Sequence, residues 1–140
     1  MAPSGRPILL SLRMVSMAEI DDAVITVNDG TPVQPTVMYF PQSNDVQVTV
    51  QYPTIADGTG CQSEFYYKDN RFTPDDDPTT VSYTVSVNPD PDNAGATMST
   101  FVIEATDNGV NGAFWWRVDF VDSAGDRSTV GFGTLIVEAV

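Results

Sequence analysis

The stretch that decides the fold lies late in the chain and runs Phe114-Trp115-Trp116-Arg117-Val118-Asp119-Phe120. Its even-numbered side chains are all apolar, whereas the odd-numbered ones are Trp, Arg and Asp. Because successive side chains of a β-strand point to opposite faces, this pattern predicts a strand with one buried and one exposed face. We therefore expect Trp116 in the core. We expect Trp115 on the outer face beside Arg117, where it either anchors a partner or stacks under the guanidinium.

The same period of two recurs through most of the chain. Turn-forming residues separate the segments that show it, which cover residues 24–28, 36–40, 46–52, 64–68, 81–87, 98–106 and 129–137. No segment keeps a helical period of about 3.6 residues. Short strands at a regular spacing with turns between them predict an all-β, antiparallel β-sandwich of about seven or eight strands.

The final predicted strand differs from the others because it is apolar on both faces. Leu135 and Val137 point one way, and Phe132 and Ile136 point the other way. A terminal strand often forms a sheet edge, and an edge this apolar is normally covered in a native protein. We therefore expect a segment of this chain or of a neighbouring chain to cover it.

A resemblance to known domains rests on residues 114–127, where the aromatic strand runs into the turn Asp122-Ser123-Ala124-Gly125. This arrangement resembles the penultimate strand and final hairpin of immunoglobulin-like and fibronectin-III-like domains. The resemblance implies an immunoglobulin-like β-sandwich over residues 19–140. The paired cysteines of antibody-type domains are missing, because Cys61 is the only cysteine.

Residues 1–18 differ in composition from the rest of the chain. They hold two basic residues, Arg6 and Arg13, and no acidic residue. Their apolar side chains alternate, which suits an added strand, and these are Ile8, Leu10, Leu12 and Met14. Three interpretations stay open: a partner-binding N-terminal arm, a frayed tail, and a true start at Met17. The apolar run of residues 8–12 is too short for a signal peptide, so we expect none.

The charge balance excludes two classes of partner. Nineteen acidic residues stand against six basic ones, which gives a formal net charge of −13. Nucleic acid and anionic membrane surfaces both require a basic footprint, so we expect neither as a partner. No stretch approaches the roughly 20 apolar residues of a membrane span.

The reactive side chains argue against an enzyme. The chain has no histidine, so a Ser or Cys nucleophile would lack its usual base. Lys68 is the only lysine, and its polar surroundings in the sequence predict a solvated side chain. No cofactor is expected. Structural calcium at Asp75, Asp76 and Asp77, or at Asp90 and Asp92, is the weaker interpretation of these loops, and solvated turns are the stronger one.

A small, acidic, histidine-free domain with a short arm is similar in overall character to auxiliary virion proteins of tailed bacteriophages. This similarity implies a capsid decoration or minor capsid protein, located in the virion and assembled in the host cytoplasm. Its partners would be major capsid or tail subunits, or further copies of itself. The residues expected to bind them are Arg6, Ile8, Leu10, Leu12, Arg13, Met14, Trp115 and Arg117. Alternatives are a tail or baseplate protein, and an extracellular glycan- or protein-binding module that uses Trp115.

Overall fold

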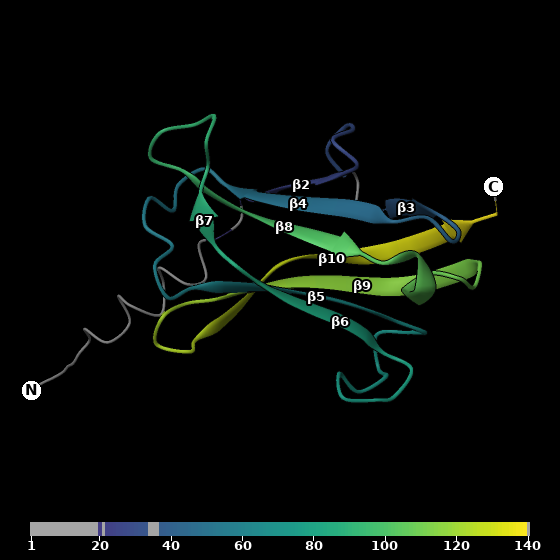
Figure 1. Cartoon of the computed structure of the whole chain (residues 1–140). Helices are drawn as coiled ribbons and strands as arrows, with labels where there is room; N and C mark the ends of the chain where they lie inside the picture. The colour runs from purple at the N-terminus through teal and green to yellow at the C-terminus, as the bar shows by residue number, and fades with distance from the viewer. Residues whose placement is uncertain (1–19, 21, 34–36, 140) are drawn as a thin grey trace, which may run out of the picture.

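The computed structural model describes residues 20, 22–33 and 37–139. Within these ranges nine strands form two sheets that face each other as layers (Figure 1). One sheet has the order β2 (Val24–Val27), β4 (Val46–Tyr52), β8 (Thr97–Ile103) and β7 (Asn88–Pro89). The other has the order β3 (Val37–Pro41), β10 (Arg127–Glu138), β9 (Gly112–Val121), β5 (Gln62–Lys68) and β6 (Val81–Ser86). The prediction of an all-β fold with two sheets is confirmed.

The core lies between the two sheets and consists of the side chains that the period of two assigned to the inner face. Trp116 is 1% exposed, and Val118 beside it on the same face of β9 is fully buried. β4 contributes four fully buried side chains to the opposite wall, which are Val46, Val48, Val50 and Tyr52. Removing this apolar surface from water is the main force that holds the layers together.

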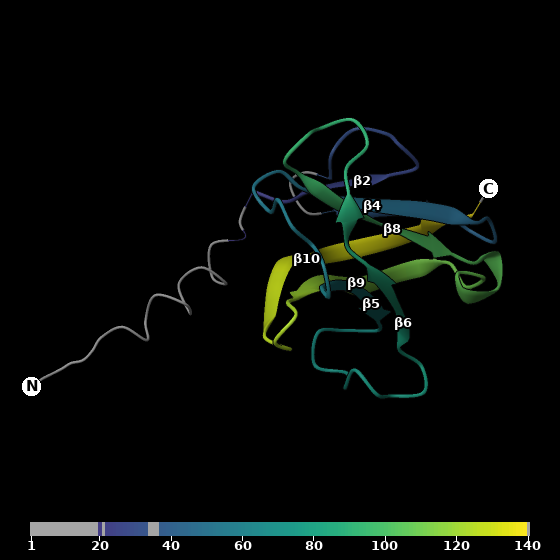
Figure 2. The same cartoon turned by 60° about the vertical axis from the view of Figure 1, so that its left-hand side comes forward.

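The free edge of the apolar last strand is covered by this chain itself, through a pairing that differs from the expectation. β10 lies between β9 and β3, and β3 runs parallel to it, with Leu135 opposite Met38 and Ile136 opposite Tyr39. The prediction of a purely antiparallel sandwich is therefore wrong in the five-stranded sheet. These two neighbours cover both edges of β10, whereas its outer face stays open, with Phe132 56% exposed. Figure 2 shows β10 beneath β2 and β4.

A chain of buried hydroxyl groups joins the two sheets inside the core. Tyr52 of β4 and Ser63 of β5 share a hydrogen bond of 2.6 Å, and Ser63 and Ser99 of β8 share one of 2.7 Å. Ser99 also donates to the Ser86 carbonyl at 3.0 Å. Burial raises the pKa of Tyr52 to about 12, so its phenol stays neutral. Each hydroxyl thus has a partner, which offsets the cost of burying it.

The strand predicted over residues 98–106 ends earlier, at Ile103, and a 3-10 helix follows at Ala105–Asp107. The chain leaves the sheet here because side chains take over its backbone hydrogen bonds. The Tyr83 hydroxyl accepts the Glu104 amide at 3.0 Å, and Asp45 Oδ1 accepts the Ala105 amide at 2.8 Å. Across the described ranges, no helix is long and apolar enough to cross a membrane.

Candidate protein-binding site

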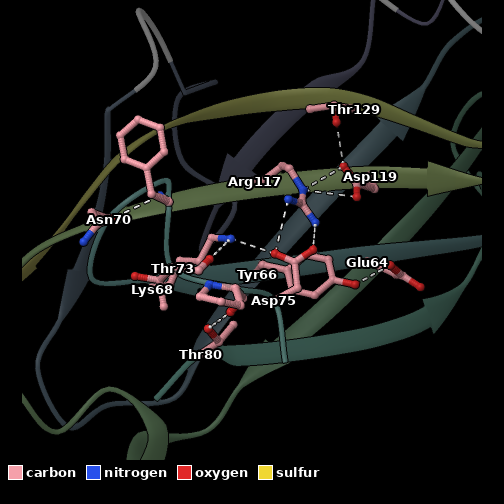
Figure 3. A network of polar contacts seen from close by, with 12 residues as sticks. Glu64, Tyr66, Lys68, Asn70, Thr73, Asp75, Thr80, Arg117, Asp119 and Thr129 are labelled. Atoms are coloured by element: carbon pink, nitrogen blue, oxygen red, sulfur yellow. Dashed lines mark hydrogen bonds and ion pairs between the residues drawn. The ribbon is translucent and has the colours of Figure 1, made fainter. Parts of the chain in front are cut away.

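The polar side chains on the outer face of the five-stranded sheet form one connected network. Figure 3 shows side chains of β5 and β9 reaching toward one another across this face, with Asp75 of the following loop among them. Alternate residues of a strand point to the same face of the sheet, which explains the composition of this face. Glu64, Tyr66 and Lys68 alternate along β5, and Arg117 and Asp119 alternate along β9. In the register, Tyr66 lies opposite Arg117 and Glu64 lies opposite Asp119.

Lys68 is buried, so the prediction of a solvated lysine is wrong. Its side chain is only 4% exposed. The ammonium donates to the Thr73 carbonyl at 2.6 Å and to Asp75 Oδ1 at 2.7 Å (Figure 3). It also lies 5.3 Å from the centre of the Trp115 ring. The loop after β5 folds back over the strand end and supplies these oxygens. A buried cation requires such partners, and here it has a carboxylate, a carbonyl and an aromatic face.

Arg117 is the centre of the network. Its guanidinium binds the Asp75 carboxylate with two contacts of 2.7 and 3.3 Å, and the Asp119 carboxylate at 3.1 Å. It also lies 4.5 Å from the centre of the Tyr66 ring (Figure 3). Of the two alternatives for Trp115, stacking under Arg117 is not observed, because Lys68 lies over the Trp115 ring and Arg117 lies over the Tyr66 ring. A planar guanidinium suits this combination of paired carboxylate contacts and ring stacking.

Asp119 is the most deeply buried carboxylate of the network, at 1% exposure. It accepts hydrogen bonds from Arg117, from Arg127 at 3.2 Å and from the Thr129 hydroxyl at 2.9 Å. Arg127 also pairs with Glu64. Burial by itself would raise the pKa of Glu64, but the hydrogen bonds from Arg127 and Tyr66 outweigh it and lower that pKa. Glu64 is therefore held ionised by a cation in direct contact.

The network carries no net charge of its own. Its three cations are Lys68, Arg117 and Arg127, and its three carboxylates are Glu64, Asp75 and Asp119. Because these cancel, the whole excess of −13 comes from the other three basic and sixteen acidic residues of the chain. A like-charged neighbour would meet less repulsion at this network than at the acidic loops.

Beside the network lies an exposed apolar patch made of Tyr39, Trp115, Phe132 and Ile136, called the sheet-face patch below. Tyr39 is 53% exposed and Phe132 is 56% exposed, whereas Trp115 and Ile136 are half-buried. The register places them on one face: Ile136 lies opposite Tyr39, and the Trp115 and Phe132 ring centres are 6.1 Å apart. Large apolar side chains grouped on one face of a soluble domain are typical of interaction sites.

Acidification is expected to weaken the network and destabilise the fold. Arg117 first, and Lys68 after it, hold the pKa of Asp75 below its usual range, and the pKa of Glu64 is lowered as well. A carboxylate whose pKa is lower in the folded state stabilises the fold above its unfolded pKa of about 4. That stability is lost as the pH falls through the lower, folded value.

Urea unfolding between pH 6 and pH 2.5 measures this effect. In the wild type we expect the urea concentration at the unfolding midpoint to decrease as the pH falls below about 4. It should decrease less in Asp75→Asn, because one of the two carboxylates with a lowered pKa is then missing. An identical pH dependence in both proteins would contradict the assigned role of Asp75.

The predicted site residues are only partly within the described ranges. Trp115 and Arg117 lie on one face, as expected. The six arm residues lie outside the described residues, and they are Arg6, Ile8, Leu10, Leu12, Arg13 and Met14. Sequence reasoning placed Phe132 on an apolar face but did not count it as a site residue, and it missed Tyr39 and the whole set of ion pairs. The sequence did contain a sign of this network. Glu64, Tyr66 and Lys68 alternate along one strand, so their three polar groups point to the same face.

The acidic loops use their carboxylates locally. Asp75 binds two cations, Asp77 accepts from the Thr79 amide at 2.8 Å, and Asp90 accepts from the Asp92 amide at 2.9 Å. Among the residues described, no group of three or more acidic or cysteine side chains is placed to hold a metal ion. These contacts are those of rigid turns, which stabilise themselves through Asx-type hydrogen bonds.

Cys61 lines a shallow hollow of about 390 Å³, together with residues 56–60, Gln62 and residues 86–89. Burial raises the pKa of its thiol, and the nearby carboxylates of Asp122 and Asp57 act in the same direction. A thiol of this kind stays protonated near neutral pH and is a poor nucleophile. The hollow therefore lacks the activated group that a cysteine enzyme needs.

Comparison with known proteins gives no family for this chain. No protein-family model matches the sequence, and no curated protein matches it either.

Proposed function

We propose that this chain is a non-enzymatic structural protein that binds neighbouring protein subunits of a larger assembly. The observation that carries the proposal is the outer face of the five-stranded sheet, where a charge-balanced network lies beside the exposed sheet-face patch. Protein interfaces combine exposed aromatic anchors with arginine and polar groups in this way. On a chain with a net charge of −13, such a face is the part best suited to meet another acidic subunit.

We further propose that the fold is immunoglobulin-like. The order β2-β4-β8-β7 corresponds to the A-B-E-D sheet of such domains, and β10-β9-β5-β6 corresponds to G-F-C with one added strand after C. β3 then corresponds to a second half of the first strand, which moves to the other sheet and pairs with β10. This reading agrees with the resemblance carried by residues 114–127.

The assembly we propose is the virion of a tailed bacteriophage, with this chain as a capsid decoration or minor capsid protein. The support is the similarity of overall character described above, together with an outer sheet face on which three cations and three carboxylates cancel. In this proposal the arm and the sheet-face patch hold the chain on its neighbours. The remaining carboxylates point outward, where they keep finished particles apart in solution.

Sedimentation of the chain in its source lysate tests the proposal. We expect recovery in megadalton particles, and loss of that recovery on deletion of residues 1–17 and in Phe132→Asp. Val102→Asp is a matched control, because Val102 is 55% exposed, close to the 56% of Phe132, and lies in β8 of the other sheet. It should remain with the particles. Mass spectrometry of the co-sedimenting chains would separate a capsid from a tail.

A chain of 15.1 kDa that sediments only as a free species would contradict the proposal. Retention of Phe132→Asp in the particles would leave the arm as the attachment and would remove the sheet-face patch from it.

A further inference from the structure

The strand β6 offers an open edge that carries no charge. It is the last strand of the five-stranded sheet, and within the described ranges its ladder partner is β5 alone (Figure 1). The sequence from residue 78 to residue 89 contains no acidic or basic side chain, although the chain as a whole is strongly acidic. Natural edges are usually protected by charge, by an internal proline or by a bulge. β6 pairs with β5 without a register shift and has no charge or proline within it.

The hydrogen-bonding groups on the open side follow from the ladder. The Val87 amide donates to the Cys61 carbonyl at 3.3 Å, and residues that bond to one neighbour alternate along an antiparallel strand. The odd-numbered residues of β6 therefore bond to β5. The main-chain groups of Ser82 and Thr84 face the open side, where an added strand would bond to them.

The inward-pointing side chains of β6 are only partly covered by the rest of the domain. Val81, Tyr83 and Val85 point inward and pack against the core, yet they are only half-buried. Ser82 and Thr84 point outward and are exposed. A strand that complements this edge would therefore have one apolar row, to cover the inner side chains, and one more polar row on the outside.

The arm sequence has this pattern and the opposite charge. Its apolar row is Ile8, Leu10, Leu12 and Met14, and its other row is Leu9, Ser11 and Arg13. Arg6 and Arg13 flank the apolar run, whereas carboxylates outside the ion-pair network stand on both sides of β6 in the sequence, at residues 76 and 77 and at residue 92. Residues 8–14 extended would span about 23 Å, and the six residues of β6 span about 20 Å. We propose that residues 6–14 of one copy add as a strand to β6 of a second copy.

The length of the chain favours a second copy over the chain's own arm. Ile20 precedes β2, and in strand order β2 and β3 lie at the opposite side of the sandwich from β6. A strand added at β6 lies five inter-strand steps from β3, about 24 Å. Only six residues lead from Met14 to Ile20, and fully extended they reach at most about 22 Å. The proposal rests on the proposed function for the role of the arm, and it adds the surface that receives the arm.

Two single substitutions in the full-length chain separate the donor from the acceptor. Thr84→Pro removes the amide on the open side of β6, and an edge strand tolerates proline where its N–H faces outward. Leu10→Asp places a charge in the apolar row of the arm and leaves β6 intact. Thr84→Ala is the matched control, because it keeps the amide. Analytical ultracentrifugation over a concentration series measures association, and circular dichroism checks that each variant is folded.

We expect the wild type and Thr84→Ala to form concentration-dependent oligomers, and Thr84→Pro and Leu10→Asp each to stay monomeric. An equimolar mixture of the two monomeric variants should restore a heterodimer, because one supplies an intact arm and the other an intact edge. Oligomers of Leu10→Asp alone would overturn the proposal in favour of direct pairing between two β6 edges. A wild type that stays monomeric would also overturn it, while sedimentation with particles would still support the proposed function.

Discussion

Replacing Arg117 by methionine is expected to lower the free energy of unfolding by about 3 kcal/mol, because removing one partner of a buried ion pair leaves the other charge uncompensated. Asp119 is 1% exposed and would keep only Arg127 and Thr129 as partners. Asp75 would lose its two guanidinium contacts as well. Methionine keeps most of the side-chain volume, so the loss measures charge pairing rather than packing. Chemical denaturation at pH 7 is the measurement.

Two further variants make the interpretation specific. Arg71→Met removes an exposed arginine outside the network and should change stability by less than about 0.5 kcal/mol. The double variant Arg117→Met with Asp119→Leu should recover a large part of the loss, since replacing both partners leaves no unpaired charge. A double variant less stable than the single Arg117→Met would show that Asp119 stabilises the fold through its other partners.

Replacing Trp116 by alanine should cost more, about 3–5 kcal/mol, because it opens a large cavity in the core. The indole is 1% exposed, and its tip lies against the backbone of β10, where a Cβ added to Gly131 would meet it at 3.1 Å. The site cannot collapse easily around such a rigid wall. For a domain stabilised by about 5–15 kcal/mol, this loss is a large share of the total.

The neighbouring tryptophan provides the matched control. Trp115→Ala removes the same side chain from the same strand, but from the outer face, where Trp115 is half-buried against Phe132 and Lys68. We expect it to cost about 1 kcal/mol or less. Urea titrations followed by the fluorescence of the remaining tryptophan would compare the two. Equal losses would contradict the assignment of the two residues to opposite faces.

The prediction of the strands succeeded because alternation is a local property. Phe114, Trp116 and Val118 are alternate residues of one strand and therefore point to the same face. Where one face of a sheet packs on the core, this alternation decides which side chains are buried. The parallel pairing of β3 with β10 depends on how two distant segments meet, and nothing within either segment encodes its partner. The early end of β8 likewise depends on Asp45 and Tyr83, which come from other parts of the chain.

The candidate site was predicted in part for the same reason. Trp115 and Arg117 were assigned to the outer face by their parity. The burial of Lys68 was missed because it comes from a loop that folds back over it, and the Asp75 carboxylate belongs to a run of three aspartates in which no single one stands out. Loop geometry of this kind is set by turns and tertiary contacts rather than by a repeating pattern.

The position of β10 between β9 and β3 has a consequence for how the protein acquires its structure. During synthesis β3 emerges early, yet its partner is the last strand of the described chain, so almost the whole domain is made before the two can meet. When two such distant segments pair, the chain between them loses much conformational entropy, so the pairing forms late. Until then β3 lacks the ladder partner that it has in the described part of the chain, and Met38 and Phe40, which end in the core, are left uncovered. Slow folding and a need for protection by chaperones are therefore expected of this topology.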